Sequence, residues 1–237
     1  MNTNTSQSDQ SLLGNIVKRM VQVALLVAFM AVVLFLSSGR LNWMWAWIFI
    51  GLNLIGVLIN SIILLRYNPE TIAERAEAEG MKDWDKIVSG LWAVTYYILM
   101  LLVAGLDTRF GWTPLLALAL YVAGSIVFVL GFAFFSWAMI SNAYFTAVVR
   151  IQAERGQTIC TTGPYRFVRH PGYVGAIIQS LATPLLLGSL WALIPGGVAA
   201  ILMVTRTALE DQTLHQELDG YQDYAQQVRY RLLPGIW

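Results

Sequence analysis

Long stretches without a charged residue alternate with short polar segments along this chain of 237 residues. The uncharged runs cover residues 20–38, 41–65, 87–106, 110–149 and 171–205. A helix needs about 20 apolar residues to cross a bilayer, and each run approaches or exceeds that length. The pattern therefore predicts an all-α, polytopic integral membrane protein with about five to six transmembrane helices.

Two of the runs are too long for one straight membrane helix. Within the run 110–149 we place the fourth helix near 114–140, so that the residues after it emerge from the membrane. The run 171–205 is too long for one span and short for two. Because Gly188 lies near its middle, we predict a helical hairpin that turns there.

The polar segments predict further elements outside the membrane. Residues 1–15 are rich in Ser, Thr, Asn and Gln, and we expect them to be disordered. The segment 66–86 carries charges and an Asn-Pro-Glu helix start, which predicts an interfacial helix at about 69–80 with its charges in solvent. From residue 206 onward the chain is polar and helical, and Gly220 divides it into two cytosolic helices.

Composition supports the membrane assignment and excludes several kinds of site. Hydrophobic residues make up 57% of the chain and charged residues only 12%. A net charge of +1 offers no basic face, so we expect no nucleic-acid partner. A single cysteine excludes an intramolecular disulfide, and with two distant histidines it gives no metal-ligand spacing, so we expect no metal.

The distribution of basic residues predicts the orientation. If the N-terminus is cytosolic, all of the 15 Lys and Arg residues except Arg40 and Arg109 fall on the cytosolic side. This places the polar segment before residue 171 and the C-terminal helices on the same, cytosolic side. We accordingly divide the chain into membrane helices at 1–140 and a catalytic region at 141–237, with the active site facing the cytosol.

The densest group of chemically useful side chains is GPYRFVRHPGYVG at residues 163–175. Pro171 is well placed as the first residue of a helix, which leaves His170 near the cap and positions the opening amides toward a ligand. The simpler alternative is an arginine-rich turn that anchors a membrane helix.

A second group, Arg206 and Glu210, should meet the first, because the hairpin returns the chain to the surface that it left. The two residues are four apart and therefore share one helix face. They could form an ordinary surface ion pair. Charges at the end of an apolar hairpin are costly, however, which favours a functional role.

Taken together, these motifs resemble the isoprenylcysteine carboxyl methyltransferase family. The resemblance rests on RHPGYVG, on RTALEDQTL at 206–214 and on GYQDYAQQVRYRLLP at 220–234. Phospholipid N-methyltransferases share similar C-terminal features. The chain departs from the eukaryotic family pattern at Arg150, Gln157 and Asp211, where that pattern has a neutral amide, a histidine and a second glutamate.

The resemblance implies that S-adenosylmethionine binds between the RHPGY segment and the C-terminal helix. Carried over by position, the cofactor-binding residues would be Arg150, Gln157, Thr158, Ile159, Cys160, Tyr165, His170, Pro171, Gly172, Tyr173 and Glu210. Arg206 would bind the methyl acceptor, and Arg206 and Glu210 would be the catalytic pair. Tyrosine faces suit the sulfonium cation of this cofactor.

These expectations favour a membrane methyltransferase that methylates the carboxylate of a lipid-like or prenylated acceptor. We expect membrane lipid to be a partner as well. A carboxylate acceptor needs positioning but no general base, whereas an amine acceptor would need His170 or Glu210 to accept a proton. We expect the acceptor to enter sideways, between the fourth helix and the hairpin.

Two alternatives from other classes remain open. Sterol-type membrane reductases carry a related C-terminal region and use NADPH, whose 2′-phosphate the arginines between 150 and 169 could contact. A small transporter or scaffold would explain the helices, although not the clustered polar residues.

Overall fold

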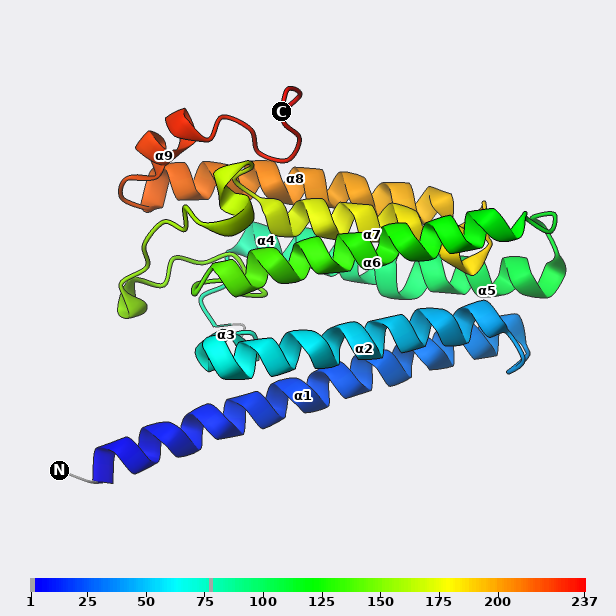
Figure 1. Ribbon diagram of the computed structural model, residues 1–237, viewed down its shortest axis with the longest axis horizontal. Helices are drawn as coiled ribbons and strands as arrows, with labels where there is room; N and C mark the ends of the chain where they lie inside the picture. Colours follow the sequence, from blue (N-terminus) through cyan, green and yellow to red (C-terminus); the bar gives the residue numbers. More distant parts are fainter. Residues whose placement is uncertain (1–2, 77–78) are drawn as a thin grey trace.

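The computed structural model describes residues 3–76 and 79–237, and within these ranges the chain forms helices and loops without a strand (Figure 1). The α-helices are α1 (Thr3–Ser38), α2 (Met44–Tyr67), α3 (Pro69–Glu74), α4 (Asp83–Ala93), α5 (Leu101–Phe110), α6 (Leu118–Ser141), α7 (Pro171–Leu187), α8 (Leu193–Glu217) and α9 (Tyr221–Gln227). A π-helical segment, Val94–Met100, joins α4 to α5 without a break, and 3-10 turns cover Ala153–Arg155 and Gly163–Arg166.

Five helical segments are long and apolar enough to cross a membrane. They are Leu12–Ser38, Met44–Tyr67, Asp83–Phe110, Leu118–Ser141 and Leu193–Glu217. Helix α7 is also apolar but has only 17 residues. The predicted class, an all-α multi-pass membrane protein with a C-terminal hairpin, is confirmed.

The helices gather the polar parts of the chain at one end of the bundle (Figure 1). Helices α1 and α2 run side by side along one side, and α6, α7 and α8 form the opposite side. The loop between α6 and α7, the short α3 and the C-terminal α9 all lie at the end where α8 finishes. Segments far apart in the sequence can therefore build one site there.

The C-terminal hairpin turns where the sequence predicted. Gly188 ends α7 with a φ of +76°, a left-handed conformation that favours glycine. The ring of Tyr121 on α6 lies against this turn and leaves no room for a Cβ atom. The turn is also tied to α5, because the Ser189 hydroxyl donates a hydrogen bond of 2.5 Å to the carboxylate of Asp107.

Helices α6 and α7 pack backbone against backbone. A Cβ atom at Gly175 would lie 2.7 Å from the carbonyl oxygen of Gly131, and one at Gly124 would lie 2.5 Å from the amide nitrogen of Leu186. Small residues allow this close approach between membrane helices. The contact between these helices is therefore tight at Gly124, Gly131 and Gly175, and entry of an acceptor between the fourth helix and the hairpin stays a prediction.

Two expectations for the polar segments are wrong. Helix α1 already begins at Thr3, so residues 3–15 are helical and not disordered. Extending a helix that is nucleated in an adjacent apolar run costs little, and this favours helix over coil. The helix expected at about 69–80 ends at Glu74, and residues 77–78 of that range lie outside the described residues.

Part of the charge of this segment is in solvent, as at Glu70, and part is covered because the loop after α6 folds over α3. Glu70 pairs with Arg155 at 2.9 Å, and Glu74 pairs with Arg150 at 2.8 Å. Asp85, at the start of α4, has an exposed fraction of 0%. The segment thus supplies charged partners to the polar end of the bundle.

Candidate functional site

A cavity of about 450 Å³ lies at the polar end of the bundle and extends between the membrane helices. Its apolar part is lined from α1, α2 and α6 by Val23, Leu26, Val27, Met30, Val57 and Phe132. Its polar part is lined by the loop after α6 and by the facing ends of α7, α8 and α9. The volume falls within the range that is typical of small-molecule sites.

The structure brings nearly all of the predicted site residues to this cavity. Those that line it are Arg150, Gln157, Thr158, Ile159, Cys160, Tyr165, His170, Gly172, Tyr173, Arg206 and Glu210. Pro171 does not line it; this residue begins α7, where its fixed φ suits the first helical position.

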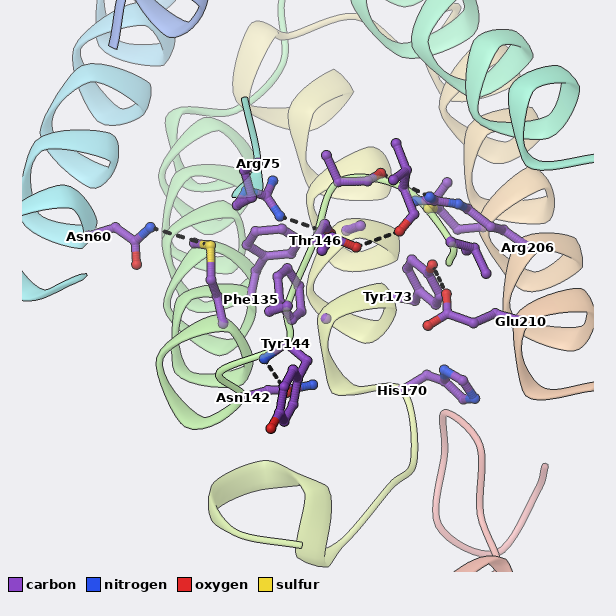
Figure 2. A pocket seen from close by; sticks show the side chains of 18 of the residues that line it. Asn60, Arg75, Phe135, Asn142, Tyr144, Thr146, His170, Tyr173, Arg206 and Glu210 are labelled. Carbon is purple, nitrogen blue, oxygen red and sulfur yellow. Dashed lines mark hydrogen bonds between the residues drawn. The ribbon is translucent and has the colours of Figure 1, made fainter. Parts of the chain in front are cut away.

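Three side chains from α7 and α8 meet at the centre of the cavity (Figure 2). Because Tyr173 lies in the first turn of α7, its ring faces α8, and its hydroxyl donates a hydrogen bond to Oε2 of Glu210. The Arg206 guanidinium carbon lies 5.3 Å from the centre of the same ring. The second carboxylate oxygen of Glu210 has no hydrogen-bond partner among the described residues, so it is available to a ligand.

Arg206 pairs with Asp85 and not with Glu210. Its Nε and Nη2 donate to the two carboxylate oxygens of Asp85 at 2.7 and 2.9 Å, and Nη2 also donates to the carbonyl of Ala147 at 3.0 Å. The remaining nitrogen, Nη1, has no partner in the described part of the chain. A bidentate pair of this kind fixes the plane of the guanidinium. Nη1 is therefore a hydrogen-bond donor that is held in a fixed orientation and available to a ligand.

Asp211, one residue after Glu210, holds the loop before α7 and the C-terminal tail together. Arg169 contacts both of its oxygens at 2.8 and 3.2 Å, and Arg231 contacts Oδ2 at 2.7 Å. The hydroxyl of Tyr221 donates to Oδ1 at 2.9 Å, and Nε2 of His170 lies 3.1 Å from the same oxygen. This network fixes the positions of Arg169, His170 and Tyr221, which also line the cavity.

Arg169 therefore fastens the motif instead of facing a ligand. Its Nη1 also donates to the backbone carbonyls of Val228 and Arg229, both at 2.9 Å. Although burial opposes the charge, hydrogen bonding to Asp211 raises the pKa of Arg169. A permanently charged arginine at this position keeps the tail 228–231 against the loop.

The loop after α6 forms the outer wall of the polar part and is folded by its own hydrogen bonds. The side-chain oxygen of Gln157 accepts from the amide of Gln152 at 2.7 Å. The hydroxyl of Tyr224 on α9 donates to the carbonyl of Tyr165 at 2.8 Å. Burial raises the pKa of Tyr165, so its ring is a neutral part of the wall.

Sequence reasoning missed several residues of the cavity. Asp85, which holds Arg206 but does not itself line the cavity, was not singled out, although an acid at the start of an apolar run needs a charged partner. Arg19 and Arg75 do line the cavity. Arg19 directly precedes an apolar run, where an arginine lies near the membrane surface and must be solvated or paired, whereas no such signal marks Arg75.

Comparison with known proteins relates this arrangement to one family. Residues 123–216 match the model of the isoprenylcysteine carboxyl methyltransferase (ICMT) family. No curated protein matches the sequence.

One similar solved structure is that of the eukaryotic intramembrane Ras methyltransferase ICMT, without a monobody, which is 18% identical to this chain with a TM-score of 0.54. The similarity covers 92% of this chain and 75% of that one, so the two share a fold. Residues 123–216 are thus similar to the isoprenylcysteine carboxyl methyltransferase family, and the chain shares its fold with one solved structure of that kind.

Proposed function

We propose that this protein transfers a methyl group from S-adenosylmethionine to a carboxylate carried on an apolar, lipid-like or prenylated acceptor. Methyltransferases of the family use this cofactor. The observation that carries the proposal is that one cavity joins the cluster of Tyr173, Glu210 and Arg206 to an apolar space between membrane helices. A polar cofactor and a lipid-like acceptor could meet there.

The polar part of the cavity fits the chemical groups of the cofactor. When bound, S-adenosylmethionine supplies an electrophilic methyl group on a sulfonium cation. Tyrosine rings line this part, and their faces attract a cation. The unpartnered oxygen of Glu210 would accept from the ammonium or the ribose hydroxyls of the cofactor. Residues 141–237 would thus form the catalytic region, beside the membrane helices of 1–140.

The cofactor-binding residues proposed from the resemblance form one continuous surface. They are Arg150, Gln157, Thr158, Ile159, Cys160, Tyr165, His170, Gly172, Tyr173 and Glu210, with Pro171 acting through the start of α7. Arg206 would direct its unpartnered Nη1 to the acceptor, while Asp85 keeps its guanidinium in place.

Two arrangements favour a carboxylate over an amine as the acceptor. An amine must lose a proton, and the nearest histidine, His170, is already engaged by Asp211 and Tyr221. Glu210 accepts a hydrogen bond from Tyr173. A carboxylate needs neither group as a base, since positioning next to the methyl donor and exclusion of water are sufficient.

The site is proposed to face the cytosol. The support is the asymmetry of the basic residues, which favours the cytosolic side for the end that carries the loop before α7 and α9. Soluble S-adenosylmethionine would then reach the polar part directly.

Calorimetry on the purified protein in detergent tests this function. S-adenosylhomocysteine is expected to bind, and NADPH is not. The variant Glu210→Ala should weaken S-adenosylhomocysteine binding at least about tenfold, because a hydrogen bond to a charged group is worth about 1.5–3 kcal/mol. The matched control is Glu217→Ala on the same helix, whose carboxylate pairs with Lys82. Binding of NADPH alone would support a reductase, and equal binding by both variants would remove Glu210 from the site.

A further inference from the structure

Two arginines of the cavity wall have no acidic partner among the residues that the structure describes. The other arginines of the wall each contact a carboxylate: these are Arg150, Arg169 and Arg206. Arg75 instead donates to the backbone carbonyl of Thr146 at 3.2 Å, and Arg19 donates to the side-chain oxygen of Gln22 at 3.3 Å. Both bonds join a cation to a neutral group, so no carboxylate of the described residues balances either charge.

Arg75 is held in place by aromatic rings and not by an anion. Its guanidinium carbon lies 5.8 Å from the ring centre of Phe135 and 5.3 Å from that of Phe145. Figure 2 shows it beside Thr146, on the opposite side of this segment from Arg206. Protein atoms surround it, yet the side chain keeps some accessible surface, because it lines the cavity.

The surroundings of Arg75 make its charge costly. Burial, with a further contribution from Arg19, lowers the pKa of the guanidinium to about 9. Arginine nevertheless stays protonated at neutral pH. A buried cation that keeps its charge is stabilised most by a bound anion.

One unsatisfied donor in the same wall also fits a ligand that accepts hydrogen bonds. The indole Nε1 of Trp92 is buried and has no hydrogen-bond partner, although it can only donate. Trp92 packs against Tyr97 with ring centres 5.5 Å apart, and Tyr97 lies near both Arg19 and Arg75. Glu210 is the only carboxylate that lines the cavity within the described residues, and it pairs with Tyr173.

These residues lie where the two parts of the cavity meet. Arg19 belongs to α1, which also contributes Val23 and Val27 to the apolar part. Arg75 interacts electrostatically with Tyr173 and Arg206, which lie in the polar part. A ligand that extends through both parts would therefore carry an apolar chain on one side of Arg75 and its reacting group close to it.

We propose that Arg75, with Arg19 as a second cation, binds the carboxylate of the methyl acceptor and selects an anionic over a neutral head group. This inference rests on the proposed function and assigns its charge recognition to residues outside the family motif. Arg206 can donate a hydrogen bond to the acceptor, but Asp85 balances its charge. Arg75 donates to a backbone carbonyl, so no described carboxylate balances its positive charge.

The same arrangement accounts for release of the product. In the transfer, a carboxylate oxygen forms a bond to the methyl carbon as the carbon–sulfur bond breaks, and the electron pair of that bond goes to sulfur. The acceptor thereby becomes a neutral ester. The ester keeps the apolar chain but loses the charge that attracts Arg75, so the product binds less tightly than the acceptor.

The test compares three ligands that share one prenyl chain: N-acetyl-S-prenylcysteine, its carboxamide and prenyl phosphate. Binding is measured on the full chain in nanodiscs, in the presence of S-adenosylhomocysteine. The wild type should bind the carboxylate at least about tenfold tighter than the carboxamide, as expected for a charge-assisted contact. In Arg75→Gln this preference should fall to about twofold or less, with carboxamide binding unchanged, and Arg19→Gln should reduce it partially.

The control is Arg66→Gln, which removes an exposed arginine near the end of α2 that does not line the cavity. This control should keep the full preference for the carboxylate. An unchanged preference in Arg75→Gln, no binding of the carboxylate by the wild type, or tighter binding of the phosphate would each overturn the inference.

Binding of S-adenosylhomocysteine by the same preparations separates this inference from the proposed function. If the cofactor product binds and the carboxylate preference is absent, the inference alone fails. If S-adenosylhomocysteine does not bind to the wild type, the proposed function fails. If Arg75→Gln weakens S-adenosylhomocysteine and not the carboxylate, Arg75 belongs to the cofactor site and the inference is overturned.

Discussion

Asp85 on α4 and Arg206 on α8 lie 121 residues apart in the sequence, yet their side chains form two parallel hydrogen bonds inside the protein. Asp85 also accepts from the backbone amide of Val149 at 2.7 Å. One carboxylate thus links the third membrane segment, the loop after α6 and the last membrane helix. The wall of the cavity depends on this link, because each of the three segments contributes to it.

Replacing Asp85 should destabilise the protein strongly. Asp85→Asn leaves the charge of Arg206 buried without a partner, which typically costs about 3–5 kcal/mol. We expect a clear decrease of the thermal unfolding temperature in detergent. Asp83→Asn is the control, because Asp83 lies one position from Lys82 on the exposed side of α4 and pairs only with Lys86. An equal unfolding temperature for Asp85→Asn and the wild type would contradict a stabilising role of the pair.

Asp211→Asn should release the C-terminal tail from the loop before α7. Three cationic or hydroxyl partners, Arg169, Arg231 and Tyr221, would each lose a charged acceptor. We expect trypsin to cleave at the arginines of the tail much faster than in the wild type. Asp223→Asn changes an exposed aspartate on α9 and should leave the cleavage rate unaltered. Slow cleavage of both variants would show that other contacts hold the tail.

Gly175→Ala should push α7 away from α6. The added Cβ would lie within 2.8 Å of backbone and side-chain atoms of Gly131 and Phe135, and backbone cannot move aside cheaply. We expect a loss of about 1–3 kcal/mol, seen as a lower unfolding temperature. Gly197→Ala on α8 meets nothing within 4 Å and should be neutral or stabilising by up to about 1 kcal/mol. Similar behaviour of the two variants would contradict the backbone contact.

The proposed orientation can be tested with single cysteines in a Cys160→Ala background. Leu115 lies between α5 and α6 with an exposed fraction of 94%, and Ala153 is exposed in the loop after α6. A membrane-impermeant thiol reagent added to intact cells should label Leu115→Cys, whereas Ala153→Cys should react only after the membrane is opened. Labelling of both positions from the same side would refute the proposed topology.

The sequence predicted the membrane helices and the hairpin because these depend on local properties. Gly188 sits in the middle of an uncharged run, and a turn there needs only a residue that tolerates positive φ. Many residues in the polar part of the cavity were anticipated from the resemblance of the motifs to a known family, whereas Arg19 and Arg75 were not.

Other features depend on contacts between distant segments, and the sequence could not supply them. Whether Asp85 faces water or Arg206 is decided by how α4 packs on α8, not by its neighbours in the chain. The short α3 likewise ends at Glu74 under the loop that carries Arg150. The close backbone contact between α6 and α7 could not be predicted for another reason: a hydropathy pattern treats Gly131 as one more apolar residue.

The contact between α6 and α7 and the contact between α2 and α6 differ in how easily they could open to the bilayer. Along α6 and α7 the contact is made by main-chain atoms, so opening would require whole helices to separate. Between α2 and α6 the corresponding close contact of Gly56 is with the ring of Phe132, which lines the cavity. Side-chain rotations are much faster than helix movements. A lipid in the surrounding bilayer would therefore exchange with the cavity more readily past the single ring of Phe132, between α2 and α6, than between α6 and α7.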